Sequence, residues 1–218
     1  MIRLAIFDLD GTLIDSITDI AISFNAALRA HGLPEHPLGE YKRMVGGNLE
    51  QVVARILPQD VQTDDVIDRV KTLYRQLYRE SPKENTRPYP GIAALLDELV
   101  RRGVLLAVNT NKSQALTEQI MEKLFSPWPF CAVAGYREDA PSKPDPAAVN
   151  AILATQGILP QEAVYIGDGE TDIATADNAG LPMVFVTWGQ GEANREDARV
   201  AKFVGEPHEI MKFILQYI

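Results

Sequence analysis

Two pairs of aspartates follow apolar runs of the chain. Asp8 and Asp10 come directly after the first run, and Asp168 and Asp172 follow a later one. Carboxylates that meet in one place repel one another unless a cation neutralises them, so they imply either a bound metal or strongly raised pKa values. Oxygen ligands without clustered His or Cys favour Mg²⁺. The aspartates therefore predict a magnesium site.

Other polar residues suit phosphate chemistry. Thr110 and Asn111 follow the run Val104 to Val108, and Lys143 stands in a loop further along the chain. A hydroxyl can hydrogen-bond a phosphoryl oxygen, a lysine adds positive charge, and Mg²⁺ commonly joins protein carboxylates to substrate phosphates. These residues indicate a small phosphate-bearing ligand.

Short β-branched runs alternate with amphipathic stretches, and this pattern should bring these residues together. It predicts an α/β fold with a doubly wound, Rossmann-like parallel sheet covered by helices. In such a sheet, ligands bind outside the carboxyl ends of the strands. Asp145 is typical of a helix N-cap and Gly180 of a helix stop. The expected strands are Leu4–Phe7, Val104–Val108, Cys131–Ala134, Ala163–Ile166 and Met183–Val186.

The segment from Ser16 to Glu84 interrupts this alternation, because it has helical periodicity and no convincing strand. A proline-rich stretch around Pro88 and Pro90 follows it, as is typical of a linker. We therefore expect residues 16–84 to form an inserted helical cap, and residues 1–15 and 85–218 to form the catalytic core. Most of the apolar stripes in the insertion should be buried, and a lid is its natural role.

The composition of the 218-residue chain excludes several classes of protein. The content of 46% hydrophobic and 23% charged residues is that of a folded protein, and the net charge of -9 argues against nucleic-acid binding. The single cysteine, Cys131, rules out an internal disulfide framework and fits a reducing compartment. Asp8 and Asp10 break the first apolar run, and no run is long enough to cross a bilayer. We expect a cytoplasmic protein without a membrane partner, either a monomer or a homodimer.

The order of the motifs resembles that of the haloacid dehalogenase-like (HAD) hydrolases. Within that superfamily the chain is most similar to phosphoglycolate phosphatases, which carry a helical cap between the first and second motifs. Further likeness lies in Val45-Gly46-Gly47-Asn48 and in Thr110-Asn111-Lys112. The residues that carry the resemblance are Asp8-Leu9-Asp10-Gly11-Thr12-Leu13, Thr110, Lys143 in Ser142-Lys143-Pro144-Asp145-Pro146, and Gly167-Asp168 with Asp172.

The resemblance implies roles for these residues. Asp8 would attack phosphorus to form an aspartyl-phosphate, and Asp10 would act as general acid and then as general base. Thr110 and Asn111 would bind the phosphoryl group, while Lys143 and Mg²⁺ would stabilise its charge. The metal ligands would be Asp8, Asp168, Asp172 and the backbone carbonyl of Asp10.

Two cap residues, Arg43 and Gly47, are candidates for contact with the non-phosphate end of the substrate. A small carboxylate there would bind an arginine or backbone amides. An ordinary surface arginine beside a helix-helix turn explains the same residues equally well. Their role therefore stays open.

Some candidates have structural interpretations. Asp8 and Asp10 alone would suggest a turn, because Asp-Gly is a common turn pair. Asp172 can cap a helix as well as bind a metal. We interpret Lys112 as a surface or supporting residue. Gly189-Gln190-Gly191 lacks the third glycine of a dinucleotide loop, so we assign it to a loop rim.

The leading hypothesis is a Mg²⁺-dependent phosphatase that acts on a small phosphorylated metabolite, with 2-phosphoglycolate as the first candidate. A sugar-phosphate mutase or a phosphatase for another metabolite is the enzymatic alternative, because a similar cap occurs in relatives of beta-phosphoglucomutase. The alternative outside enzymes is a receiver-type phosphoacceptor switch. That switch leaves the helical insertion unexplained.

Overall fold

The computed structural model describes residues 1–216, and at its centre lies a six-stranded sheet with the order β5-β4-β1-β6-β7-β8. Every neighbouring pair of strands is parallel. The predicted doubly wound α/β fold is therefore confirmed. The strands are β1 (Leu4–Phe7), β4 (Leu105–Ser113), β5 (Phe130–Tyr136), β6 (Ala163–Gly167), β7 (Met183–Val186) and β8 (Val200–Val204).

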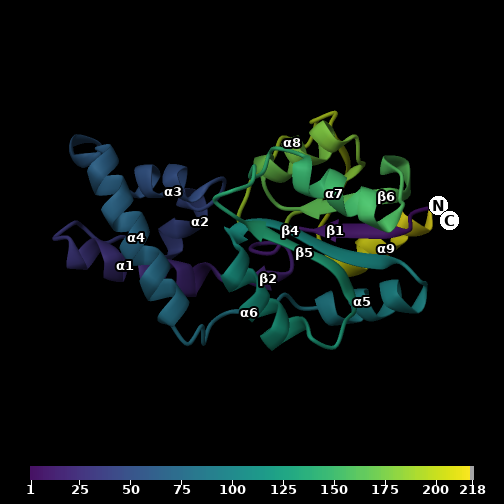
Figure 1. The fold of residues 1–218 in the computed structure, drawn as a ribbon, viewed down its shortest axis with the longest axis horizontal. Helices are drawn as coiled ribbons and strands as arrows, with labels where there is room; N and C mark the ends of the chain where they lie inside the picture. Colours follow the sequence, from purple (N-terminus) through teal and green to yellow (C-terminus); the bar gives the residue numbers. More distant parts are fainter. Residues whose placement is uncertain (217–218) are drawn as a thin grey trace.

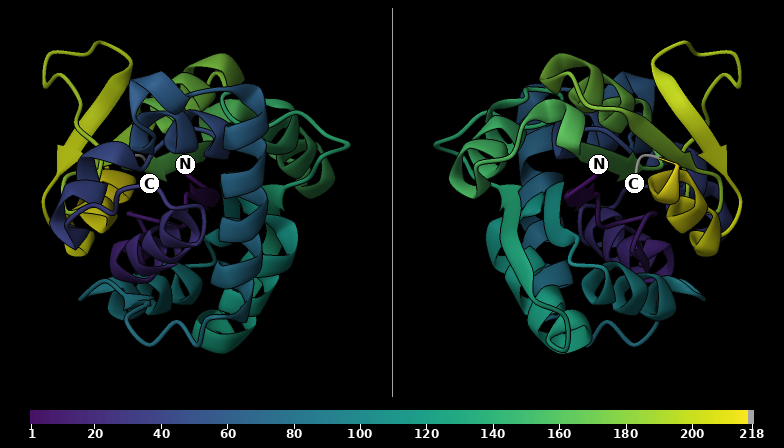
Figure 2. Two further views of the ribbon diagram at one scale, coloured as in Figure 1. Left: turned by 90° about the vertical axis from the view of Figure 1, so that its left-hand side faces the viewer. Right: turned by 90° about the vertical axis from the view of Figure 1, so that its right-hand side faces the viewer.

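All five expected strands are present, although β4 extends beyond Val108 to Ser113. The sixth strand, β8, was not predicted. It is the yellow strand at the outer edge in Figure 2, and most of its side chains are at least partly exposed. An edge strand of this kind lacks the strong apolar run that marks a strand buried on both faces.

Helices cover both faces of the sheet (Figure 1). Side chains of β1 alternate between the faces, as the period of a strand requires: Ala5 and Phe7 pack into one apolar cluster, Leu4 and Ile6 into the other. The first cluster includes α5 (Ile92–Arg101), α6 (Gln114–Phe125) and α9 (Pro207–Leu215); the second includes α7 (Ala147–Gln156) and α8 (Glu170–Ala179). Because β1 is buried on both faces, the residues that follow it are held firmly.

The sequence predicted one helix start, at Asp145, and one helix end, at Gly180, and both can be compared with the structure. Gly180 ends α8 in the left-handed conformation with a φ of 70°, as predicted. The N-cap of α7 is Pro146 rather than Asp145. Asp145 nevertheless stabilises this end, because its Oδ1 accepts the N–H of Ala147 at 2.8 Å. The prediction placed the cap one residue too early.

A separate group of helices lies beside the carboxyl ends of the strands (Figure 1). We call it the helical block. It has its own apolar cluster, which Leu116 of α6 joins from the core. Within the described residues 16–84, every regular element is helical. The block consists of α1 (Ile17–Ala30), α2 (Tyr41–Met44), α3 (Leu49–Ile56) and α4 (Asp64–Glu80), with short 3-10 turns at Leu38–Glu40 and Gln59–Val61.

The chain enters and leaves the helical block along a two-stranded antiparallel ribbon. Its strands are β2 (Ile14–Asp15) and β3 (Arg87–Pro88), in which Asp15 pairs with Arg87. The buried carboxylate of Asp19, in the first turn of α1, accepts hydrogen bonds from the backbone N–H of Asn85 (3.0 Å) and the hydroxyl of Thr86 (2.6 Å). The start of α1 is thereby tied to the return linker.

Among the described residues, no helix is long and apolar enough to cross a membrane. The 17 residues of α4 include acidic and basic side chains along its whole length. Such a helix suits an amphipathic position against the rest of the helical block.

Candidate active site

Lys143 lies between two buried aspartates at the carboxyl ends of the strands. Its Nζ is 2.7 Å from Oδ1 of Asp8 and 2.6 Å from Oδ1 of Asp172. Asp8 directly follows β1, and its N–H donates to the carbonyl of Ile166 in β6. The three side chains are at most 10% exposed, so water screens these ion pairs weakly. The sheet thus joins residues that are remote in sequence.

Asp172 has the helix-capping role that the sequence suggested and also faces the site. It lies in the first turn of α8, and its Oδ2 accepts the N–H of Gly169 at 3.0 Å, which stabilises the helix end. Its Oδ1 meanwhile pairs with Lys143. Helix stabilisation therefore fixes the orientation of a carboxylate that serves the site.

Asp168 is held by donors from two loops. Its Oδ1 accepts the hydroxyl of Thr12 at 3.2 Å, and its Oδ2 accepts the backbone N–H groups of Gln190 (2.8 Å) and Gly191 (3.2 Å). The loop can approach Asp168 this closely only because residue 189 is glycine, since a Cβ there would lie 2.4 Å from Oδ2 of Asp168. The segment Gly189-Gln190-Gly191 is therefore a support for Asp168, and its assignment to a loop rim was incomplete.

The carboxylates of Asp8, Asp168 and Asp172 form a group that could hold a metal ion. One oxygen of each lies within 4.8 Å of the others, and all three residues are buried. A buried site with oxygen ligands only fits Mg²⁺. The side chain of Asp10, which was predicted with the metal set through its backbone carbonyl, lies outside this group in the described structure.

Burial controls the protonation of these groups. Desolvation, together with repulsion from Asp172 and Asp168, raises the pKa of Asp8 to about 7, although Lys143 opposes the shift. Desolvation and Asp172 likewise raise the pKa of Asp168 to about 6. Burial would lower the pKa of Lys143, but Asp172 and Asp8 raise it well above its usual value. One lysine facing three carboxylates leaves an excess of negative charge, which a divalent cation would neutralise.

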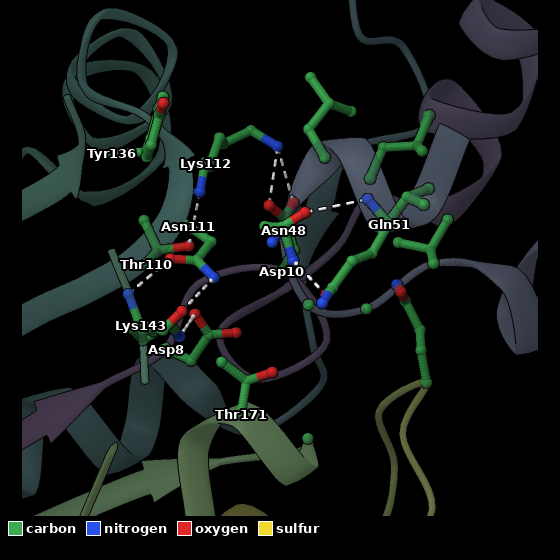
Figure 3. Close-up of a pocket in the computed structure, with 18 of the residues that line it drawn as sticks. Asp8, Asp10, Asn48, Gln51, Thr110, Asn111, Lys112, Tyr136, Lys143 and Thr171 are labelled. Atoms are coloured by element: carbon green, nitrogen blue, oxygen red, sulfur yellow. Dashed lines mark hydrogen bonds and ion pairs between the residues drawn. The ribbon is translucent and has the colours of Figure 1, made fainter. Parts of the chain in front are cut away.

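Asp10 is directed toward Lys112 (Figure 3). The Nζ of Lys112 lies 2.9 and 2.8 Å from the two carboxylate oxygens, and the hydroxyl of Ser16 donates to Oδ1 at 2.5 Å. The Lys112 side chain is only 5% exposed. The expected surface position of Lys112 is therefore wrong, whereas the alternative supporting role agrees with this contact.

Thr110 and Asn111 follow one another along β4 but make different contacts. Thr110 is buried and lines the cavity beside Asp8. Asn111 also lines the cavity, but both polar atoms of its amide contact the backbone of Lys143: Oδ1 accepts the N–H at 3.0 Å and Nδ2 donates to the carbonyl at 3.2 Å. The structure thus gives Asn111 a contact that positions Lys143.

A cavity of about 670 Å³ separates these groups from the helical block. Arg43 and Gly47 line it from the block, as the sequence suggested. The Arg43 side chain has no hydrogen-bond or ion-pair partner among residues 1–216. A Cβ on Gly47 would lie 4.0 Å from the hydroxyl of Thr171, so the block closely approaches α8. The predicted site residues that line the cavity are Asp8, Asp10, Arg43, Gly47, Thr110, Asn111, Lys143, Asp168 and Asp172.

Comparison with known proteins places this geometry in a family. The family model described as haloacid dehalogenase-like hydrolase matches residues 5–186. The chain belongs to this family. This HAD hydrolase is also 30% identical to the phosphoglycolate phosphatase of Aquifex aeolicus (strain VF5) over 217 residues, which cover 99% of this chain and 98% of that protein.

Two further matches agree. The phosphoglycolate phosphatase of Rhodospirillum rubrum is 36% identical over 196 residues, with 87% of this chain and 81% of that protein covered. A crystal structure named as a predicted phosphoglycolate phosphatase, from Haemophilus somnus 129pt, has a TM-score of 0.88 and 26% identity over 98% of each chain. This HAD hydrolase is therefore an enzyme similar to phosphoglycolate phosphatases, which are phosphoric monoester hydrolases. A receiver-type switch no longer describes it.

Sequence reasoning about the HAD hydrolase missed three contacts that organise the site, two at Asp168 and one at Asp10. Gln190 and Gly191 act through backbone N–H groups, which every residue except proline carries, so their residue types gave no signal. Lys112 reaches Asp10 from the end of β4, where the pairing with β5 is irregular between Asn109 and Ser113, so strand alternation gave no signal for the direction of its side chain.

Proposed function

We propose that this HAD hydrolase is a Mg²⁺-dependent phosphatase that hydrolyses a small phosphate monoester, with 2-phosphoglycolate as the first candidate. The observation that supports it most is the group of Asp8, Asp168 and Asp172 with Lys143 inserted between two of them. When Mg²⁺ is bound there, it supplies positive charge that offsets the charge of the phosphoryl oxygens. The similarity to named phosphoglycolate phosphatases supports the same proposal.

Asp8 is the proposed nucleophile. Lys143 occupies its Oδ1, while Oδ2 accepts no hydrogen bond from the described residues. In the first step an oxygen of Asp8 bonds to phosphorus while the bond from phosphorus to the leaving oxygen breaks, giving an aspartyl-phosphate. The Nζ of Lys143 and the hydroxyl of Thr110 stabilise the charge on the transferring group.

Asp10 is the proposed general acid and base. In the first step its carboxyl proton passes to the leaving alkoxide, which departs as an alcohol. In the second step Asp10 takes a proton from water as the water oxygen bonds to phosphorus and the bond to Asp8 breaks. Inorganic phosphate leaves and both aspartates return to their starting forms.

We assign residues 16–84 to a cap over the core of residues 1–15 and 85–218. The cavity between them and the antiparallel linkers support this assignment. Arg43 is the proposed ligand for a carboxylate on the substrate, because its exposed guanidinium has no partner within residues 1–216 and lines the cavity. The working assembly and location are a monomer or homodimer in the cytoplasm, where the single Cys131 would remain reduced.

The deciding experiment measures phosphate release from a panel of glycolate, sugar and nucleotide phosphates and pyrophosphate, with Mg²⁺ or with EDTA. We expect Mg²⁺-dependent release that is fastest with 2-phosphoglycolate. Asp8→Asn should lower kcat by at least about 10⁴-fold, because an amide is a poor nucleophile. The exposed Asp177 of α8 offers the matched control, and Asp177→Asn should retain parental activity.

Three results would contradict the proposal or part of it. The purified parent with Mg²⁺ could release no phosphate from any ester, which would exclude the reaction. Isomerised hexose phosphate without free phosphate would instead identify a mutase. Full turnover by Asp8→Asn would remove Asp8 from the nucleophilic role while leaving phosphatase activity in place.

A further inference from the structure

Lys112 contacts the core and the cap at once. On the core side its Nζ pairs with both oxygens of Asp10, at 2.9 and 2.8 Å. On the cap side it lies 4.6 Å from the centre of the Tyr78 ring. Lys112 belongs to β4, whereas Tyr78 lies near the end of α4. A buried lysine thus connects a cap aromatic ring with the proposed proton donor.

Tyr78 is the last ring of an aromatic column that extends through the cap. Its ring stacks on Tyr74 with centroids 5.7 Å apart, and Tyr74 stacks on Phe24 at 3.7 Å. Phe24 in turn stacks on Tyr41 at 6.0 Å. Every pair is within 13° of parallel. The column packs Tyr78 against the rest of the cap, so the position of its ring follows that of the cap.

Lys112 uses the face of the Tyr78 ring. A lysine within about 6 Å of an aromatic centroid is attracted by the negative face of the ring, more strongly where water is excluded. Tyr78 is 1% exposed and the side chain of Lys112 is 5% exposed, so this contact is desolvated. The Tyr78 hydroxyl is buried without a hydrogen-bond partner among residues 1–216. The contact therefore runs through the face of the ring, and the hydroxyl lies near the same ammonium group.

The other groups around this contact lie where the two linkers meet the cap. Ser16, which directly precedes α1, donates to Oδ1 of Asp10. Lys83, in the return segment, lies 5.2 Å from the centre of the same Tyr78 ring. Lys112 carries an ion pair to Asp10 and lies over the ring of Tyr78, so it joins the two directly.

We propose that Tyr78 is a positioning residue that acts through Lys112 to orient Asp10 when the cap lies against the core. This inference rests on the proposed phosphatase function and adds a coupling between cap position and proton transfer. With the cap in the observed position, the ring holds Lys112 and Lys112 holds both oxygens of Asp10. With the cap displaced, Lys112 loses one of its two supports. Proton donation to the leaving group is then less well aligned.

The test compares two substrates that differ in their need for a proton donor. An alkyl phosphate such as 2-phosphoglycolate has a poor leaving group, whereas p-nitrophenyl phosphate has a good one that leaves without a proton. Tyr78→Leu should therefore lower kcat for the alkyl phosphate by about 2- to 30-fold more than for the aryl phosphate. The KM for the alkyl phosphate should stay within about twofold, because the effect passes through Lys112.

Two control variants separate positioning from a general disturbance of the cap. Tyr78→Phe keeps the ring and should restore the parental ratio of alkyl to aryl kcat. Tyr41→Leu removes the ring at the other end of the same column, away from Tyr78 and Lys112, so it should leave this ratio at the parental value even if both rates fall. Thermal unfolding of each variant reports whether it is folded.

If Tyr78→Leu does not fold, Tyr78→Met replaces it, and the ratio of alkyl to aryl kcat should fall in the same way. Lys112→Met removes the cation from the ring, and the ratio should again fall. Combining Lys112→Met with Tyr78→Met should produce no further fall, because the side chain at position 78 then has no cation to hold. An equal loss with both substrates, or equal damage from Tyr78→Phe and Tyr78→Leu, would overturn the inference. A parent that hydrolyses neither substrate would instead overturn the proposed function.

Discussion

The side-chain amide of Asn111 makes two hydrogen bonds with the backbone of Lys143, one accepted by Oδ1 and one donated by Nδ2. This contact joins the end of β4 to the loop that carries the lysine of the site. Lys143 in turn positions Asp8 and Asp172. The geometry of the two carboxylates therefore depends on a residue that makes no hydrogen bond with either of them.

Asn111→Ala should consequently lower kcat by roughly 10- to 100-fold, because small displacements of reacting groups have effects of that size. Steady-state kinetics with the best substrate measures the change. Asn178→Ala is a useful comparison, since Asn178 also donates to the loop carbonyl of Pro144 but from the exposed surface. We expect little effect from it, and equal losses for both variants would contradict the special role of Asn111.

Stability of the metal-free enzyme should fall as the pH rises from about 4 to about 7. In this interval Asp8 and Asp168, with pKa values of about 7 and about 6, still bind protons in the folded state. The unfolded chain has released its protons near pH 3.8, the ordinary value. The unfolded state then binds fewer protons, so the free energy of unfolding decreases with pH.

Added Mg²⁺ should offset this loss, so the Tm gained from Mg²⁺ should be larger at pH 8 than at pH 5. Thermal unfolding with Mg²⁺ or with EDTA at the two pH values tests this without any activity measurement. The Asp168→Asn variant removes one proposed ligand and should gain less. A Tm gain independent of pH would argue against binding at these carboxylates.

Asp19→Ala should destabilise the protein by roughly 2–4 kcal/mol, because it leaves the buried hydroxyl of Thr86 and the N–H of Asn85 without their charged acceptor. Urea unfolding provides the measurement. Glu84 lies in the same linker with an exposed side chain, so Glu84→Ala should change stability by less than about 0.5 kcal/mol. Similar values for the two variants would show that the linkers do not depend on Asp19.

Arg43→Ala should raise the KM for 2-phosphoglycolate by about 10-fold or more, as expected when a charged hydrogen bond to the substrate is lost. Phosphate esters without a carboxylate should show little change. Lys42→Ala, at the neighbouring exposed position of α2, serves as the matched control. An equal rise in KM for both kinds of ester would assign Arg43 to the phosphate end or to cap structure.

The sheet and the polar residues at its edge could be predicted from the sequence. Buried parallel strands have nearly continuous apolar runs, and their carboxyl ends lie at the same edge of the sheet. Asp8 and Asp168 are examples: each directly follows an apolar run or its terminal glycine. The pairing of Lys112 with Asp10 could not be predicted in the same way. A lysine side chain can extend to solvent or fold inward, and only the packing of Tyr78 and the position of Asp10 select the inward path of Lys112.

The edge strand β8 and the loop that supports Asp168 were harder to predict from the sequence, for different reasons. Lys202 interrupts β8, whose partial exposure removes the requirement for an unbroken apolar run. Gly191 lies so close to Asp168 that a Cβ would meet its backbone oxygen at 2.0 Å. A glycine in a loop does not by itself reveal which residue approaches it.

The antiparallel ribbon would let the proposed cap be exchanged as a unit. Asp15 and Arg87 are paired across the ribbon. The points at which the chain leaves the core and returns to it therefore lie side by side. A short turn could therefore reconnect them without redirecting any core strand, and a foreign insert could be grafted at the same place. New substrate preferences could in this way arise by replacement of one contiguous stretch of gene, while the reaction centre is inherited intact.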